Sequence, residues 1–270
     1  MGRISRGWKL TKLSLRVIRK DKEILLLPVL SGLTMAVVLA SFVAGIFLTG
    51  GLGAGSGLTG LVLMAAFYFV AYFIAIFFNA AVIGCATIRL GGGDPTVADG
   101  LRIAADNALR ILAWALVAAT VGLVIRAVQE RVGLIGKIVM GALGVAWSLV
   151  TYFVVPVLIY ERLGVWESVK RSASVFKGTW GETLVGNLGL GIIFVLLGLA
   201  GVVPIALGFL AGGATGLFVG IGVAVVYWLV LVVVQAAAEG VLVAALYRYA
   251  TTGQVAEGLE GVRFASPWTR

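Results

Sequence analysis

Long apolar segments without charged residues constrain this chain more than any other feature of its sequence. The run from Ile24 to Thr49 contains no Asp, Glu, Lys or Arg, and several later segments are similarly apolar. A helix needs about 20 mostly apolar residues to cross the hydrocarbon core of a bilayer. Only 12% of the residues are charged and the mean hydropathy is +1.09, whereas soluble domains carry about 25% charged residues. The sequence therefore predicts an all-α, multi-pass membrane protein.

The hydropathy pattern predicts a polytopic helix bundle of about six spans within one transmembrane domain, residues 1–270. A basic amphipathic helix (1–23) is expected before the bundle (24–247), and a cytoplasmic tail (248–270) after it. Two uncharged Gly-rich segments, GGLGAGSGLTG and LAGGATG, are predicted turns. Pro156 and Pro204 are expected to kink their helices. The expected spans are 24–49, 58–88, 111–125, 138–160, 184–211 and 214–247.

The distribution of basic residues predicts the orientation of these spans. Of the 21 Lys and Arg, 18 fall at the two termini and in the segments 89–110 and 161–183. Only Arg126, Arg131 and Lys137 fall on the other side, where residues 126–137 could extend the third helix. Cytoplasmic segments are enriched in Lys and Arg, so both termini are expected in the cytoplasm. This accounts for the net charge of +9 without a nucleic-acid partner. The first apolar run is too long for a cleavable signal peptide.

Amphipathic helices are expected along the inner face of the membrane. The N-terminal segment places Lys9, Lys12, Arg16, Arg19 and Lys20 on one helical face. Such a face attracts anionic lipid headgroups, or serves only as a topology signal. A second amphipathic helix is expected from Val165, with Lys170 and Arg171 among its polar residues. The segment Thr179-Trp180-Gly181-Glu182 has the form of a capping box and is predicted to begin the fifth span.

A similar plan at 94–110 suggests an internal duplication. With a shift of 68 residues, Val97 aligns with Val165, Asp99 with Glu167 and Arg102 with Lys170. Asp94 is the expected N-cap of the upstream copy, followed by Pro95 at the first helical position. Each copy stands between two spans, so the expected duplicated unit is span, amphipathic helix, span.

Small residues and a few polar residues stand inside the expected spans. Stripes such as Gly32-Ala36-Ala40-Ala44, Gly212-Gly216-Gly220 and Ala236-Gly240-Ala244 predict close helix packing. The candidate intramembrane polar site consists of Glu239, Gln235, Asn79 and Asn187. An acid within the membrane suggests function, although a carboxyl group paired with Asn or backbone donors would serve packing alone.

The sequence offers no set of catalytic residues. There is no His, and the single Cys85 lies in an apolar run, where it is expected to pack. A disulfide framework is excluded, and neither a metal site nor a cofactor is expected. The Gly-rich segment GGLGAGSG lacks the Gly-Lys-Ser/Thr of a phosphate-binding loop.

Three stretches resemble a prokaryotic family of six-helix integral membrane proteins without an assigned function. They are RKDKEILLLPVLSG at 19–32, TYFVVPVLIYERLGVWESVKRSASVFKGTWGE at 151–182 and AALYRYATTGQVAEG at 244–258. More distantly, a Pro, an acid and then a helix with Lys-Arg-Ser and Trp resemble membrane domains grouped with glycerophosphodiester phosphodiesterases. The resemblance implies a six-helix fold in a prokaryotic plasma membrane, and no reaction.

Three functional hypotheses follow. The first is a non-enzymatic membrane protein that organises lipid or partner proteins at the inner face of the membrane. Its expected partners are anionic membrane lipids, and a membrane-protein partner or a homo-oligomer. The second is a small transporter or channel that uses Glu239, Gln235, Asn79 and Asn187. The third, an intramembrane enzyme, lacks a visible catalytic set, so we do not expect an enzyme.

Overall fold

The computed structural model of the chain describes residues 3–48 and 58–253, with side chains from residue 12 and, after the gap, from residue 60. Its described part is helical and contains no strand, which confirms the all-α prediction. Most of the predicted turn GGLGAGSGLTG and most of the predicted tail lie outside the described residues, and the last three residues of that turn segment belong to the helix that begins at Leu58. The helices are α1 (Arg3–Lys20), α2 (Glu23–Leu48), α3 (Leu58–Leu90), α4 (Val97–Asp106), α5 (Ala108–Arg131), α6 (Leu134–Val150), α7 (Val154–Tyr160), α8 (Val165–Ala200) and α9 (Val203–Thr252).

The chain forms two compact units whose segments alternate along the sequence. Unit 1 contains Met1–Leu25, Ala86–Asp94 and Thr179–Arg270, and unit 2 contains Leu26–Cys85 and Pro95–Gly178. Helix α8 contributes to both, so we call its first part, residues 165–178 of unit 2, α8N. In unit 1, α1 packs against α9.

Five segments of the described chain are long and apolar enough to cross a membrane. Large apolar side chains such as Leu33, Leu196 and Phe218 are exposed along them, as expected for helices that face lipid. These features identify a membrane protein. The segments are Glu23–Leu48, Gly60–Leu90, Ala108–Arg131, Leu134–Tyr160 and Val165–Thr252.

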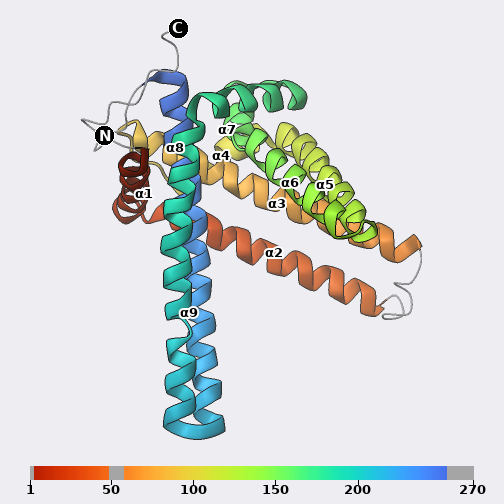
Figure 1. Cartoon of the computed structure of the whole chain (residues 1–270), viewed down its shortest axis with the longest axis vertical. Helices are drawn as coiled ribbons and strands as arrows, with labels where there is room; N and C mark the ends of the chain where they lie inside the picture. The colour runs from red at the N-terminus through yellow and green to blue at the C-terminus, as the bar shows by residue number, and fades with distance from the viewer. Residues whose placement is uncertain (1–2, 49–57, 254–270) are drawn as a thin grey trace. The chain divides into compact units, whose positions relative to one another are not determined.

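The last of these segments reverses direction in unit 1. Gly212 (φ −150°) and Gly213 (φ 57°) leave the helical conformation, and the positive φ of Gly213 suits glycine alone among common residues. This confirms the turn predicted at LAGGATG. Gly212 therefore belongs to the turn and not to a packing stripe. The second part of α8 and the start of α9 run down to the turn, and the rest of α9 runs back beside them (Figure 1).

Small residues allow the two arms of this α8–α9 hairpin to touch. A Cβ on Gly216 would collide with the Gly208 carbonyl group, and a Cβ on Gly220 would collide with that of Pro204. Residue numbers rise on one arm as they fall on the other, so the arms are antiparallel. The close packing predicted for Gly216 and Gly220 is confirmed. Gly32, in contrast, has open space around it, and Ala36, Ala40 and Ala44 are exposed.

A helix break before Pro204 is stabilised by aromatic side chains of the opposite arm. Helix α8 ends at Ala200 and α9 begins at Val203, as the predicted kink requires. The Gly201 N–H bonds to the Gly198 carbonyl group instead of that of Leu197. Tyr227 Oη donates to the Leu197 oxygen at 2.7 Å, and Trp228 Nε1 donates to the Gly198 oxygen at 3.0 Å. The Leu197 carbonyl group, released at the break, thus finds a partner in Tyr227, as a backbone group must where the surroundings are lipid.

The predicted kink near Pro156 is also confirmed, in unit 2. Thr151–Phe153 form a turn between α6 and α7. The Phe153 N–H, which is released from the helix, donates to Ser172 Oγ of α8N at 2.9 Å. Trp114 of α5 stacks on Trp147 of α6 beside this turn, with ring centroids 6.0 Å apart.

Two boundaries differ from the sequence predictions. The third span, expected at 111–125, is the longer helix α5, which extends to Arg131 and so includes part of the extension considered at 126–137. The capping box at Thr179 is wrong, because α8 continues from Val165 to Ala200 and Thr179 lies inside it. An S/T-x-x-E pattern also fits a helix interior, where Thr179 Oγ1 instead accepts from Thr183 Oγ1 at 3.3 Å.

Candidate functional site

The exposed side of α1 carries a basic face of four side chains. Leu13, Val17 and Ile18 are buried, whereas the basic side chains Lys12, Arg16, Arg19 and Lys20 are exposed. Lys9 falls among the side chains outside the described residues. A shallow cavity of about 300 Å³ is lined by Lys12, Leu15, Arg16 and Arg19. Helix α1 therefore offers several cations around one recess, with its apolar side turned into the protein.

Helix segment α8N presents a second exposed face, with a Trp and a Lys one turn apart. Trp166 is 64% exposed, and Lys170 is exposed on the same side. Arg171, which was predicted beside Lys170 as a headgroup contact, instead donates from Nε to Glu161 Oε1 at 2.9 Å. Of the two predicted cations of α8N, Lys170 is the one directed away from the protein.

Both α4 and α8N begin with a carboxylate that accepts the backbone N–H at the start of the helix. In α4, the Thr96 N–H donates to Asp99 Oδ2 at 2.9 Å. In α8N, the Gly164 N–H donates to Glu167 Oε2 at 3.2 Å. These residues align under the shift of 68. The sequence predicted Asp94 as the N-cap of α4, and this prediction is wrong. The N-cap is Thr96, whose hydroxyl accepts the Asp99 N–H in a capping box.

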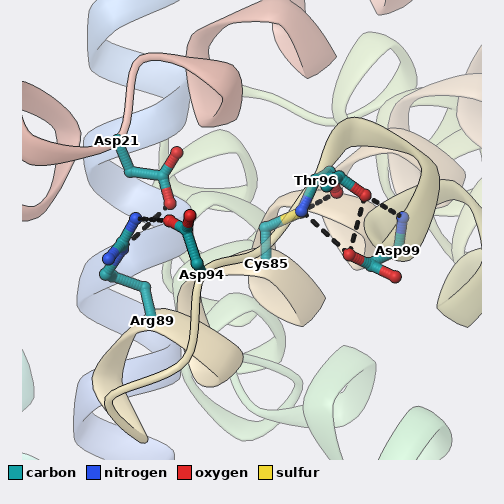
Figure 2. Close-up of polar contacts among 6 residues, drawn as sticks. All are labelled: Asp21, Cys85, Arg89, Asp94, Thr96 and Asp99. Carbon is teal, nitrogen blue, oxygen red and sulfur yellow. Dashed lines mark hydrogen bonds and ion pairs between the residues drawn. The ribbon is translucent and has the colours of Figure 1, made fainter.

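The cap of α4 lowers the pKa of Asp99. The main cause is the Thr96 hydroxyl, which donates to Asp99 Oδ2 at 2.7 Å, followed by the Thr96 N–H. Both donors stabilise the charged carboxylate. Cys85 of α3 lies beside this cap, and its thiol donates to the Thr96 carbonyl oxygen at 3.4 Å (Figure 2). Cys85 is buried, which confirms its expected packing role.

An ion-pair cluster in unit 1 was not predicted. Arg89, near the end of α3, donates from Nε to Asp21 Oδ2 at 3.0 Å and from Nη2 to Asp94 Oδ1 (Figure 2). Asp21 is buried and Asp94 is exposed. The three residues tie the joint between α1 and α2 to the end of α3. The position of Asp21 between basic residues, in the stretch RKDK, is the one sequence signal that could have indicated it.

The four candidate intramembrane polar residues are divided between the two units. In unit 1, Gln235 Nε2 donates to Glu239 Oε1 at 2.9 Å, and Glu239 is exposed rather than buried against Asn donors. Asn187 Nδ2 donates to the Thr183 carbonyl oxygen of its own helix at 2.8 Å. Asn79 is exposed and belongs to unit 2. The structure thus pairs Gln235 with Glu239.

The described part of the chain contains no group of side chains that could bind a metal ion. No group of three or more His, Cys, Asp or Glu side chains lies close enough to hold an ion there. The features that remain are electrostatic: the exposed cations of α1, the Trp and Lys of α8N, and the Gln235–Glu239 pair.

Comparison with known proteins gives a family but no activity. Neither the curated proteins nor the solved structures contain a match to this chain. Residues 58–257 match the family described as "Family of unknown function (DUF6159)". This segment covers most of the chain, including α3 to α9, and the chain belongs to that family.

Proposed function

We propose that this protein is a non-enzymatic integral membrane protein that organises anionic lipids at the inner face of a prokaryotic plasma membrane. The observation that carries the proposal is α1. Its exposed side bears Lys12, Arg16, Arg19 and Lys20, and its apolar side is buried. A basic side chain near an anionic leaflet contributes about 1 kcal/mol of attraction. In this proposal α1 lies along the membrane as an amphipathic helix.

The proposed topology has six crossings and both termini in the cytoplasm. It counts the two arms of the α8–α9 hairpin as separate crossings, because the chain reverses at Gly212 and Gly213. The bias of Lys and Arg supports the orientation. The aligned caps of α4 and α8N support an internal duplication. The distant resemblance to membrane domains grouped with glycerophosphodiester phosphodiesterases agrees with a lipid-facing role without catalysis.

Single-cysteine labelling tests this topology. In a background with Cys85→Ala, Lys137→Cys and Ser174→Cys place thiols at exposed positions. A membrane-impermeant maleimide added to intact cells should label position 137, and position 174 only after permeabilisation. Labelling of 174 in intact cells would place α8N on the outer side.

Lipid composition around the purified protein tests the function. The wild type, extracted with its native annulus from membranes of mixed phosphatidylglycerol and phosphatidylethanolamine, should be enriched in phosphatidylglycerol. A variant with Lys12, Arg16 and Arg19 changed to Gln should lose that enrichment. The double variant Arg131→Gln/Lys137→Gln removes one exposed cation from the end of α5 and one from the start of α6. This control variant should keep the phosphatidylglycerol enrichment. Equal enrichment in the wild type and the α1 variant would contradict the proposal.

A transporter is the second candidate, and the Gln235–Glu239 pair favours it. Both residues lie on α9, where an exposed carboxylate in an apolar helix is costly unless it is used or protonated. Coupled proton or cation uptake into proteoliposomes that Glu239→Gln abolishes would support transport. Uptake that persists in Glu239→Gln would leave this pair without a transport role.

A further inference from the structure

Helices α1 and α8N share a sequence pattern. This similarity is separate from the one between α4 and α8N, which the shift of 68 residues aligns. A shift of 158 residues aligns α1 with α8N, although these two helices belong to different units. Four aligned pairs are identical: Trp8 with Trp166, Lys12 with Lys170, Ser14 with Ser172, and Val17 with Val175. Arg19 aligns with Lys177, which conserves the positive charge.

The burial of the two helices follows the same alignment. From the pair Lys12 and Lys170 to the pair Asp21 and Thr179, eight of the ten pairs share the same class of burial. Ser14 and Ser172 are both fully buried. The basic pairs at 12 and 170 and at 19 and 177 are exposed on both helices. Both helices therefore bury corresponding faces and expose corresponding cations.

Helix α4 and the start of α5 follow this packing plan with no Trp and with only one of the two cations. Under the shift of 68, residues 96–110 repeat most of the burial pattern of residues 164–178. The positions there that align with Trp166, Lys170, Ser174 and Lys177 hold Ala98, Arg102, Asp106 and Leu109. The Trp and the second cation of α1 and α8N are thus added to a packing plan that α4 and α5 follow without them.

We infer that α1 and α8N are two separate sites of the same kind, each binding the phosphate of an anionic phospholipid headgroup. In α8N, Lys170 and Lys177 supply the positive charge, and Trp166 is an exposed aromatic side chain of the type that favours the membrane interface. The hydroxyl of Ser174, exposed between them, stands at the position of Arg16 and can donate to a phosphate oxygen. The Glu167 carboxylate accepts the Gly164 N–H at the start of the helix, and the two lysines outnumber this one negative charge. This inference rests on the proposed function and extends it from one helix to two.

Native mass spectrometry of the full chain tests the inference by measuring the phosphatidylglycerol retained from micelles that also contain phosphatidylcholine. The variants are Lys12→Gln/Arg19→Gln in α1 and Lys170→Gln/Lys177→Gln in α8N. Each removes two exposed cations and should weaken phosphatidylglycerol binding at its own site by about 30-fold, from about 5-fold for each charge. The combined variant should lose both populations, because it removes the cations of both helices. Arg102→Gln, at the aligned position of α4, and Arg131→Gln/Lys137→Gln should leave retention unchanged.

The outcomes separate this inference from the proposed function. If the α1 variant loses phosphatidylglycerol and the α8N variant does not, the second site is overturned while the proposed function stands. If neither loses it, both fail. Equal loss in the Arg131→Gln/Lys137→Gln control would indicate a response to net charge and overturn the inference. Competition by soluble glycerol phosphate would show that the sites bind free phosphate esters and would overturn the assignment to a lipid. Circular dichroism should show unchanged helix content, since every substituted side chain is exposed.

Discussion

Because Ser172 accepts a hydrogen bond from the Phe153 N–H, its buried hydroxyl should contribute more to the unfolding free energy than the buried hydroxyl of Ser168. The Phe153 N–H donates to Ser172 Oγ at 2.9 Å, and both residues are 0% exposed. Ser172→Ala leaves this N–H buried in unit 2 without that partner. An unsatisfied buried donor costs about 1–3 kcal/mol, which corresponds to a roughly 5- to 140-fold larger unfolding constant.

Ser168 provides a matched control one helical turn earlier. It is also 0% exposed, but its Oγ has no hydrogen-bond partner within the described chain. Ser168→Ala removes the same atom and changes the helix propensity of α8N by the same amount. Ser168→Ala leaves no buried donor without a partner. We therefore expect its unfolding free energy to equal that of the wild type or to be slightly higher.

Two measurements check the difference between these variants. Unfolding in mixed micelles of increasing dodecyl sulfate content, followed by circular dichroism, gives the two free energies. Hydrogen exchange across 149–157 reports the Phe153 amide directly, and it should lose protection in Ser172→Ala alone. Equal unfolding free energies and equal protection in the two variants would refute the reasoning.

Three further predictions follow from the contacts described above. Gly216→Leu should separate the arms of the α8–α9 hairpin and lower the melting temperature of the protein. Gly222→Leu, whose side chain would meet open space, should be tolerated. Similar melting temperatures for the two variants would contradict this prediction. The pKa of Asp99 is lowered in the folded state, so its cap stabilises α4 above the unfolded pKa of about 4 and is lost as pH falls through the folded value. Amide chemical shifts in the first turn of α4 should move in that acidic range, and Asp99→Asn should abolish the change. Glu239→Gln should leave the unfolding free energy nearly unchanged, since the amide oxygen can still accept from Gln235; a loss above about 1 kcal/mol would indicate that the charge itself is required.

The sequence predicted features that depend on neighbours along the chain. Pro156 and Pro204 interrupt helices because proline lacks the N–H that a helix interior needs. The turn at Gly212 and Gly213 follows from the conformational freedom of glycine. The apolar runs predict helices that suit a membrane because the thickness of a bilayer sets their length.

Local patterns were less informative where several conformations fit the same letters. The stripe at Gly32 and the stripe at Gly216 look alike in sequence, but only the second meets an opposing backbone. The Thr179 motif reads as a helix start and lies within α8. For the candidate site, the exposed cations of α1 were predicted from helical spacing, whereas the pairing of Arg171 with Glu161 was not.

By itself, then, the sequence determined the helical class, the apolar segments, the helix breaks and the basic face of α1, because each arises from interactions within a few residues or from transfer between water and lipid. Tertiary structure alone decided which groups satisfy the backbone at those breaks. Tyr227 and Trp228 reach carbonyl groups about 30 positions away, and Ser172 reaches the Phe153 N–H. It also placed Arg89 between Asp21 and Asp94. Such partners depend on how the helices pack in three dimensions, and no periodicity along the chain encodes that geometry.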